Sequence, residues 1–240
     1  KNELAEQVKR QEEATAKLLT SQAELEELRV NLFEENRKLD SKQNEYNLLK
    51  SLVDSLEGYP DSIKFLSKGS GWKHSASLLS ELFNVQDDYR IAIENYLDKY
   101  LNYYVVDTPQ QAYEAIALLQ EHKKGKAGFF ILSEMNSQVT PTAAQENCVS
   151  AIDLVQCDAK FKPLLQHLLQ QVYISNLPLD QVSKTTGVYL QKDGSGYQSS
   201  HHIVGGSVGI FEGNKIGRTQ RLEKLREEIE GLTSSVATHK

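Results

Sequence analysis

The segment GNKIGRT, residues 213–219, comes nearest to a nucleotide-binding motif in this chain. A phosphate-binding loop has the form GxxxxGK[ST], in which backbone N–H groups surround the phosphates and the lysine reaches them. Here Glu212 occupies the position of the first glycine and Arg218 replaces the lysine. Because both parts of the phosphate cradle are missing from the motif, the sequence predicts no nucleotide site.

The adjacent histidines His201 and His202 are the best candidates for metal ligands. Neighbouring residues on a strand point to opposite faces, so the two rings cannot readily bind one ion. Cys148 and Cys157 have eight residues between them, which fits neither a CxxC metal pair nor a disulfide framework. The sequence also has no GxSxG nucleophile motif. We expect no catalytic, cofactor or metal site and no enzyme activity, and the two thiols favour a reducing compartment.

Two groups of basic side chains are candidates for DNA contact. One group lies in a turn expected between a helix and a strand, and the other where a C-terminal helix is expected to begin. Such side chains can hold phosphates weakly and without sequence preference. The formal net charge is −6, however, so ordinary solvated surface remains an alternative. The candidates are Lys123, Lys124, Lys126, Lys215, Arg218 and Arg221.

Residues 1–57 show a seven-residue repeat that predicts a long coiled-coil helix. This segment contains no glycine or proline. We expect one apolar core column and a mostly polar companion column, with a single solvated helix as the alternative. The apolar column is Leu4, Leu18, Leu25, Leu32, Leu39, Tyr46 and Val53, interrupted by Gln11. The companion column is Val8, Thr15, Gln22, Arg29, Asn36, Gln43 and Lys50.

A similar pattern returns in residues 218–240, where apolar residues recur at 3-4 spacing. If the intervening chain returns to its starting point, the two helices can pair antiparallel. The second helix is the shorter, so much of residues 1–34 is expected to lack an intrachain partner. With Lys1 as the first residue, this indicates a piece of a longer chain. The apolar seam is Leu222, Leu225, Ile229, Leu232 and Val236.

Residues 58–217 alternate strand-like and helix-like runs, which predicts an α/β fold with mixed sheets in two halves, about 58–135 and 150–217. Thr108 is the expected N-cap of one helix, with Pro109 at its first position. No apolar run approaches the roughly 20 residues that a membrane span needs. Strands are expected at 101–107, 126–132, 150–155, 172–175, 187–191 and in the glycine-rich tail, helices at 88–100, 108–124 and 161–171, and either at 76–85.

The order of coil, α/β insert and returning coil resembles the hinge region of the structural maintenance of chromosomes (SMC) proteins. The run from SELFNV at Ser80 to GKAGFFIL is similar to the first hinge half of that family, with an A-I-E helix, a V-V-D strand and a G-R-A-T-F strand in that order. FKPLLQHLLQQVYIS resembles the second half, and VYLQKDGSGYQSSHHIVGGS its closing strands. Asp98-Lys99 and SSHH stand where the family often has glycine.

The resemblance implies an α/β hinge domain with mixed sheets in two halves, flanked by long α-helical antiparallel coiled-coil arms. The arms are expected at 1–57 and 218–240 and the hinge at 58–217. The resemblance also implies a two-fold dimer, in which each half of one hinge meets the other half of its partner. An exposed edge strand around 197–208 can pair across that contact. The implied interface residues are Gly194, Gly196, Gly205, Gly206 and Gly209, which otherwise serve only tight turns.

The implied function is mechanical. Such a hinge joins two subunits of a chromosome-segregation and condensation ATPase at the end opposite the ATPase heads, in the cytoplasm on the nucleoid. A homodimer of the bacterial, single-gene type is preferred over a heterodimer, and other subunits of the complex bind elsewhere on the parent protein. Two alternatives remain: a non-SMC coiled-coil scaffold whose α/β insert binds a protein partner, and a DNA-binding module that does not dimerise.

Overall fold

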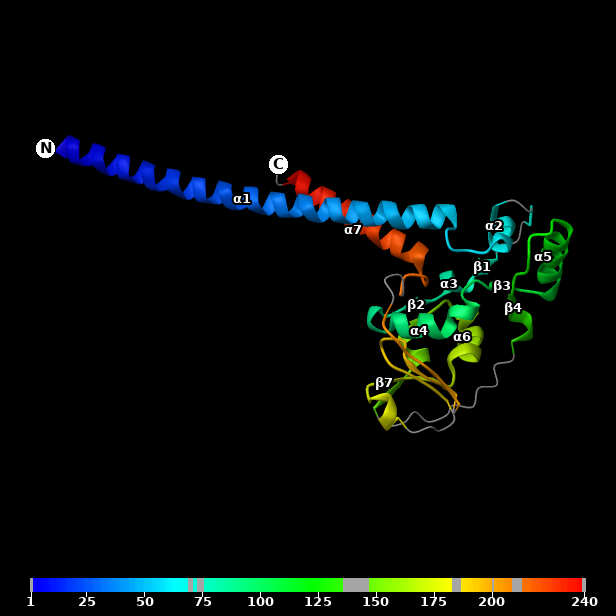
Figure 1. Cartoon of the computed structure of the whole chain (residues 1–240). Coiled ribbons are helices and arrows are strands. Elements are labelled where there is room, and N and C mark those ends of the chain that lie inside the picture. Colours follow the sequence, from blue (N-terminus) through cyan, green and yellow to red (C-terminus); the bar gives the residue numbers. More distant parts are fainter. Residues whose placement is uncertain are drawn as a thin grey trace. The chain divides into compact units, whose positions relative to one another are not determined.

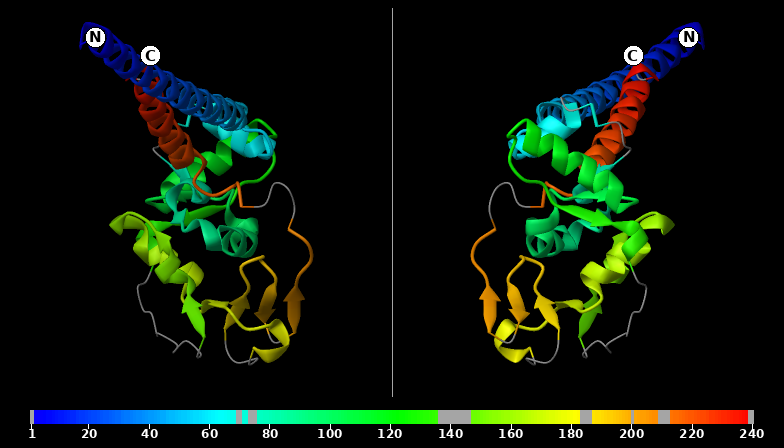
Figure 2. Two further views of the ribbon diagram at one scale, coloured as in Figure 1. Left: turned by 90° about the vertical axis from the view of Figure 1, so that its left-hand side faces the viewer. Right: turned by 90° about the vertical axis from the view of Figure 1, so that its right-hand side faces the viewer.

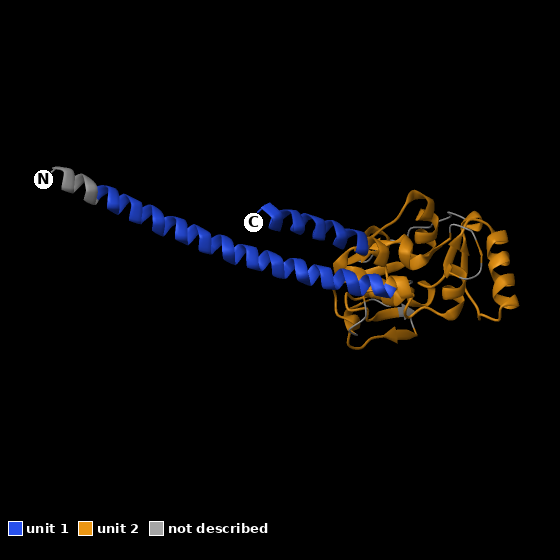
Figure 3. Ribbon diagram, turned by 90° about the horizontal axis from the view of Figure 1, so that it is seen from above, with its two compact units in different colours: residues 1–52, 222–240 blue, residues 53–221 orange. Residues whose placement is uncertain are grey.

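The computed structural model of the chain describes residues 2–68, 71–72, 76–135, 147–182, 187–199, 201–208 and 213–238. It consists of two compact units (Figure 3): residues 1–52 with 222–240 form unit 1, and residues 53–221 form unit 2. Unit 1 is helical, and unit 2 contains the sheets. Within the described ranges, no helix combines the length and apolar character needed to cross a membrane.

Unit 1 pairs two helices, α1 (Asn2–Ser55) and α7 (Arg218–Thr238), the first residues of α7 belonging to unit 2. The Ser235 hydroxyl donates a hydrogen bond to Glu35 at 3.0 Å. Further along α1 and further back along α7, Lys42 Nζ lies 2.8 Å from Glu228. The two helices therefore run antiparallel (Figure 1), which confirms the predicted pairing of the coils.

The apolar seam of α7 is confirmed, and the companion column of α1 is corrected. Leu225 and Val236 are buried. On α1 the predicted companion residues Gln43 and Lys50 are exposed, whereas Leu49 is buried and Lys42 makes the ion pair with α7. The companion column thus follows the apolar column by three residues rather than four. Both spacings bring side chains together on a helix, so the repeat alone does not choose between them.

The first sheet of unit 2 has the strand order β1-β3-β4. Strand β3 pairs antiparallel with β1 and parallel with β4. Helix α5 makes the crossover between β3 and β4, and it begins at Pro109 as predicted. The Thr108 N–H donates to the Gln111 side chain at 3.3 Å, which caps the first turn. The bounds are β1 (Ser77–Leu78), β3 (Tyr104–Val106), β4 (Phe129–Ile131) and α5 (Pro109–Glu121).

The second sheet has the order β10-β9-β8-β7-β5, with β7 and β8 parallel and the other neighbours antiparallel. The predicted mixed-sheet α/β fold is therefore confirmed. Strand β10, orange in Figure 2, lies at one edge of this sheet, and β5 lies at the other. The bounds are β5 (Cys148–Ser150), β7 (Val172–Ser175), β8 (Val188–Leu190), β9 (Gly196–Ser199) and β10 (His202–Val204).

A short third pairing, β2 (Asn84–Val85) with β6 (Val155–Gln156), joins the two sides of unit 2. The strand expected at 150–155 is wrong in its middle, because Ala151–Leu154 forms a 3-10 turn, η4. Ala151 and Leu154 are both buried, and a 3-10 turn places residues three apart on one side. The turn therefore points both side chains into the core while the chain changes sheets.

One core runs through both sides of unit 2. Phe83, Ile93 and Leu97 from the first side pack in the same cluster as Leu164 and Ile174 from the second, and all five are fully buried. The remaining helices are α2 (Asp61–Lys68), α3 (Leu79–Leu82), α4 (Arg90–Leu97) and α6 (Lys162–Leu169). Short 3-10 turns lie at η1 (Asp87–Tyr89), η2 (Asp98–Tyr100), η3 (Leu132–Glu134), η5 (Ala159–Phe161) and η6 (Leu179–Gln181).

Candidate subunit interface

Strand β10 presents an exposed apolar edge. Its three residues are all exposed, and the exposed fractions of Ile203 and Val204 are 56% and 36%. The strand pairs on one side with β9, with an irregular register between His202 and Ile203. In the described part of the chain no strand pairs with its other side. Unpaired backbone groups beside exposed apolar side chains are a template for adding a strand from another chain.

Strand β4 is an edge of the other sheet. It pairs with β3, and among the described residues no strand covers its second side. Phe129, Phe130 and Ile131 are each partly exposed. The Phe130 ring contacts the rings of Tyr100 and Tyr103, with centroids 5.6 and 5.5 Å away. Among the described strands, the first sheet ends in β1 and β4 and the second in β10 and β5, and β4 and β10 are edges whose residues are all partly or fully exposed.

Two of the predicted interface glycines lie inside unit 2. Gly194 is buried with φ +85°, and a Cβ there would stand 2.3 Å from the Asn95 amide nitrogen. Gly196 is also buried, and a Cβ there would stand 2.2 Å from the Tyr189 carbonyl oxygen. The positive φ at Gly194 and the backbone contact at Gly196 each favour glycine within a single chain.

The other predicted interface glycines follow β10. Gly205 and Gly206 are exposed. The nearest atom to a Cβ on Gly205 would be Ser195 Cβ at 3.3 Å, and a Cβ on Gly206 would have no neighbour within 4 Å. Gly209 lies outside the described residues. Gly205 and Gly206 therefore extend the exposed edge of β10 with almost no side-chain cover.

The three lysines predicted to contact DNA lie together on the turn between α5 and β4. Lys123, Lys124 and Lys126 are all exposed. Lys123 has φ +54°. The Lys124 ammonium lies 6.0 Å from the centroid of the Phe65 ring, and the Lys126 carbonyl accepts a hydrogen bond from Ser62 at 2.8 Å. The turn is thus fixed by its backbone while its three amines face solvent.

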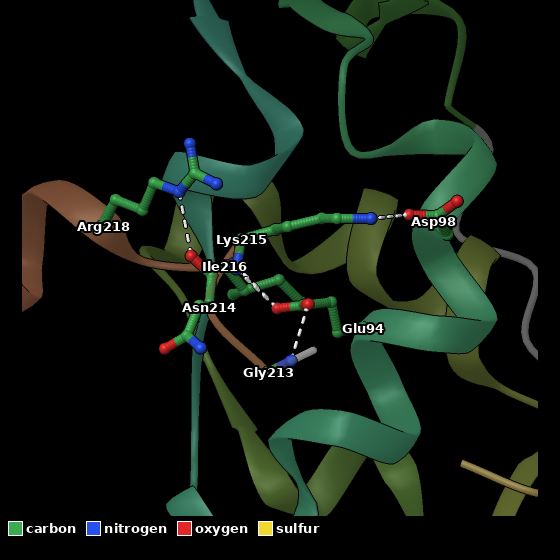
Figure 4. Close-up of polar contacts among 7 residues, drawn as sticks. All are labelled: Glu94, Asp98, Gly213, Asn214, Lys215, Ile216 and Arg218. Atoms are coloured by element: carbon green, nitrogen blue, oxygen red, sulfur yellow. Dashed lines mark hydrogen bonds and ion pairs between the residues drawn. The ribbon is translucent and has the colours of Figure 1, made fainter. Parts of the chain in front are cut away.

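The second basic group is engaged within the chain. Lys215 pairs with Asp98. Arg218 Nε donates to the Asn214 carbonyl at 2.8 Å, and Arg221 donates to the Asn214 side chain at 2.7 Å. These contacts, of which those of Lys215 and Arg218 are drawn in Figure 4, hold the residues at which the chain enters α7.

The residue that organises this exit is Glu94, which the sequence did not single out. Its side chain is only 1% exposed. The carboxylate accepts the backbone N–H groups of Gly213 at 2.8 Å, Lys215 at 2.7 Å and Ile216 at 3.2 Å (Figure 4). The position of Glu94 was the one clue in the sequence. An acidic residue among the apolar residues of a helix, here next to Ile93, needs hydrogen-bond donors inside the fold.

Comparison with known proteins supports this architecture. Residues 73–176 match the family model of the SMC proteins Flexible Hinge Domain. A crystal structure of an asymmetric dimer of the Geobacillus stearothermophilus SMC hinge domain is similar, with a TM-score of 0.74 and 21% identity over 92% of this chain and 94% of that chain. The Pyrococcus furiosus Smc hinge domain with an extended coiled coil has a TM-score of 0.54 and 22% identity, covering 94% of this chain and 81% of that one.

Two curated relatives are chromosome partition proteins Smc. The protein from Chlorobaculum tepidum is 27% identical, and the match covers 97% of this chain but 20% of the relative. The protein from Desulfitobacterium hafniense is 28% identical, with 87% and 18% covered. This chain thus spans about a fifth of the length of these relatives. Residues 73–176 thus match the SMC hinge model, and the chain as a whole is similar in sequence to Smc chromosome partition proteins and in fold to SMC hinge domains with flanking helices.

Proposed function

We propose that this chain is the dimerisation hinge of an SMC chromosome-partition protein. The observation that carries the proposal is that two sheet edges expose apolar side chains, β10 on one side of unit 2 and β4 on the other. In a two-fold contact, β10 of one subunit lies against β4 of its partner, and the same contact occurs a second time. Exposed Ile203 and Val204 then become buried, and the unpaired backbone groups gain partners.

The partner is a second copy of this chain. The two curated relatives share one name, chromosome partition protein Smc, which favours a homodimer over a heterodimer. The parent protein would be an ATPase through head domains at the far ends of the arms, and its other subunits would bind elsewhere. Its place would be the cytoplasm, on the nucleoid. The boundaries 1–57, 58–217 and 218–240, with hinge halves at 58–135 and 150–217, are proposed for the arms and the hinge.

Sedimentation velocity of the full chain tests the contact. The wild-type chain should sediment as a dimer at micromolar concentration, and Ile203→Glu should be a folded monomer, because it places an unpaired charge in the buried contact. Tyr113→Glu is the matched control, since Tyr113 is 63% exposed on α5 and lies on neither edge. A monomeric wild type would overturn the proposal. A dimeric Ile203→Glu variant would place the contact away from β10.

The lysine turn supports a second proposed role, weak contact with DNA. Three exposed amines within four consecutive residues can approach neighbouring phosphates without reading bases. Lys215, by contrast, already has Asp98 as a partner, and Arg218 and Arg221 already bind Asn214. Lys123, Lys124 and Lys126 are therefore the stronger candidates of the six.

A further inference from the structure

The hydrogen bonds that hold the start of α7 in unit 2 have acceptors in only two neighbouring helices, α3 and α4. Besides the three N–H groups held by Glu94, the Gly217 N–H donates to the Ser80 carbonyl at 2.7 Å. The Thr219 N–H donates to Glu81 Oε2 at 3.1 Å. These acceptors lie in α3 and α4, on the first side of unit 2. The chain reaches this point from β10, on the second side.

The geometry points to Glu94 as a latch that holds the root of α7 on the first side of the hinge, independently of the interface strand β10. This inference rests on the proposed function only where it refers to a dimer contact at β10. The latch is a feature of one subunit. It lets β10 adjust to a partner without moving the point at which the outgoing helix begins.

The chain between β10 and the latch is suited to this separation. Residues 205–208 are exposed and form no helix or strand. A Cβ on Gly206 would have no heavy atom within 4 Å. By contrast, Gly213 is buried with φ +76°, and a Cβ there would meet Ile91 at 2.9 Å. Residues 205–208 are thus exposed where the chain leaves β10, and Gly213 is buried where the chain meets α4.

A carboxylate is needed at position 94 because three donors converge on its two oxygens. Oε1 accepts one N–H and Oε2 accepts two. Glutamine has one carbonyl oxygen, and its NH₂ group would face a backbone N–H donor. At least one N–H group would therefore lose its acceptor inside the fold. Asp98, four residues further on at the start of η2, adds only a side-chain pair with Lys215.

Amide hydrogen exchange, followed residue by residue by NMR on the full chain, tests the latch. In Glu94→Gln, exchange at Gly213, Lys215 and Ile216 should accelerate about tenfold to a hundredfold, since hydrogen bonds to a charged group are lost. Exchange at Tyr173 and Ile174 in β7 should stay at the wild-type rate. Asp98→Asn is the control. It removes the ion pair between Lys215 and the Asp98 carboxylate, which is 58% exposed, and should leave the three amides protected from exchange.

Three outcomes would overturn the latch. Unchanged exchange at the three amides would show that other bonds hold the segment. Equal acceleration at the β7 amides would make Glu94 an ordinary contributor to global stability. Loss of dimerisation in Glu94→Gln, measured by sedimentation, would show that root and interface are coupled. The same exchange measurement on the Ile203→Glu variant separates this inference from the proposed function, because the latch should persist in a monomer.

Discussion

Glu35 and Ser235, which are 200 residues apart in the chain, meet at 3.0 Å between α1 and α7. Together with the Lys42–Glu228 pair, this contact fixes the register of the antiparallel helices. Polar pairs therefore occupy part of the helix seam, and buried leucines supply the rest of the contact. We therefore expect substitutions of the polar pairs to affect the register of the two helices, and substitutions of the buried leucines to affect the stability of unit 1.

Leu225→Ala should destabilise unit 1 by about 2–4 kcal/mol, because it leaves a cavity at a residue that is 3% exposed. Lys42→Ala should cost about 0.5 kcal/mol or less, since both partners of the Lys42–Glu228 pair are more than a third exposed. Urea unfolding followed by helical circular dichroism measures both. Equal effects of the two changes would contradict this division between apolar packing and polar register.

Reversing the charge of Lys123, Lys124 and Lys126 to glutamate should abolish retention on DNA while the sedimentation of the chain stays unchanged. Log affinity falls as log salt rises, and each lost phosphate contact should make this negative slope shallower by about 0.7–0.9. The measurement is fluorescence anisotropy with a short duplex and a single strand at several salt concentrations.

Lys9, Lys17 and Lys38 changed to glutamate form the matched control for the lysine turn. These three residues are exposed on α1, and their reversal alters the net charge by the same amount. If this control loses DNA as completely as the variant of the turn, the binding follows net charge, and the turn is not a site.

Acid should loosen the turn between β8 and β9. The Ser195 hydroxyl and backbone N–H donate hydrogen bonds to Asp193 at 2.6 and 2.9 Å and hold the pKa of this carboxyl below its ordinary value of 3.8. A carboxyl with a lowered folded-state pKa contributes its full stability above its unfolded pKa and loses it as the pH falls through the folded value. Exchange of the Ser195 amide, relative to its intrinsic rate, should therefore rise below about pH 4. Asp193→Asn should remove this dependence.

Gly196→Ala should destabilise unit 2 by about 1–3 kcal/mol, because a Cβ would stand 2.2 Å from the Tyr189 carbonyl oxygen in the neighbouring strand. Gly205→Ala should cost less than about 1 kcal/mol, since that site is exposed and its one close neighbour, Ser195 Cβ at 3.3 Å, has to shift by only a few tenths of an ångström. Thermal unfolding compares them. Similar losses from both would mean that Gly205 is also held within the chain.

Local patterns predicted the elements well where one physical rule dominated. Thr108 and Pro109 marked the start of α5, because a capping residue followed by proline has few other uses. The seam of α7 was equally clear. The companion column of α1 was misplaced, since Lys42 and Gln43 are both polar and only the partner helix decides which faces it. The strand expected at 150–155 failed because burial at Ala151 and Leu154 fits a 3-10 turn as well as a strand.

Glu94 could not be found from its own neighbourhood. Its three donors lie about 120 residues away, at separations of 119, 121 and 122. Acidic residues on helices usually face water, and no local rule tells a carboxylate that receives distant backbone donors from one that is solvated. The apolar residues around Glu94 and the glycine at position 213 were both visible in the sequence, but nothing in the sequence revealed that they meet.

The same separation sets an order for folding during synthesis. A ribosome delivers α4 long before residues 213–216, so the carboxylate of Glu94 has to stay hydrated until the last part of unit 2 has emerged. If the rest of unit 2 packed over Glu94 before residues 213–216 were present, it would bury a charged carboxylate without hydrogen-bond donors. Unit 2 should therefore mature late and as a whole, with the slow approach to the native state that long-range contacts impose. Nascent chains that end before residue 213 should remain sensitive to protease around α4.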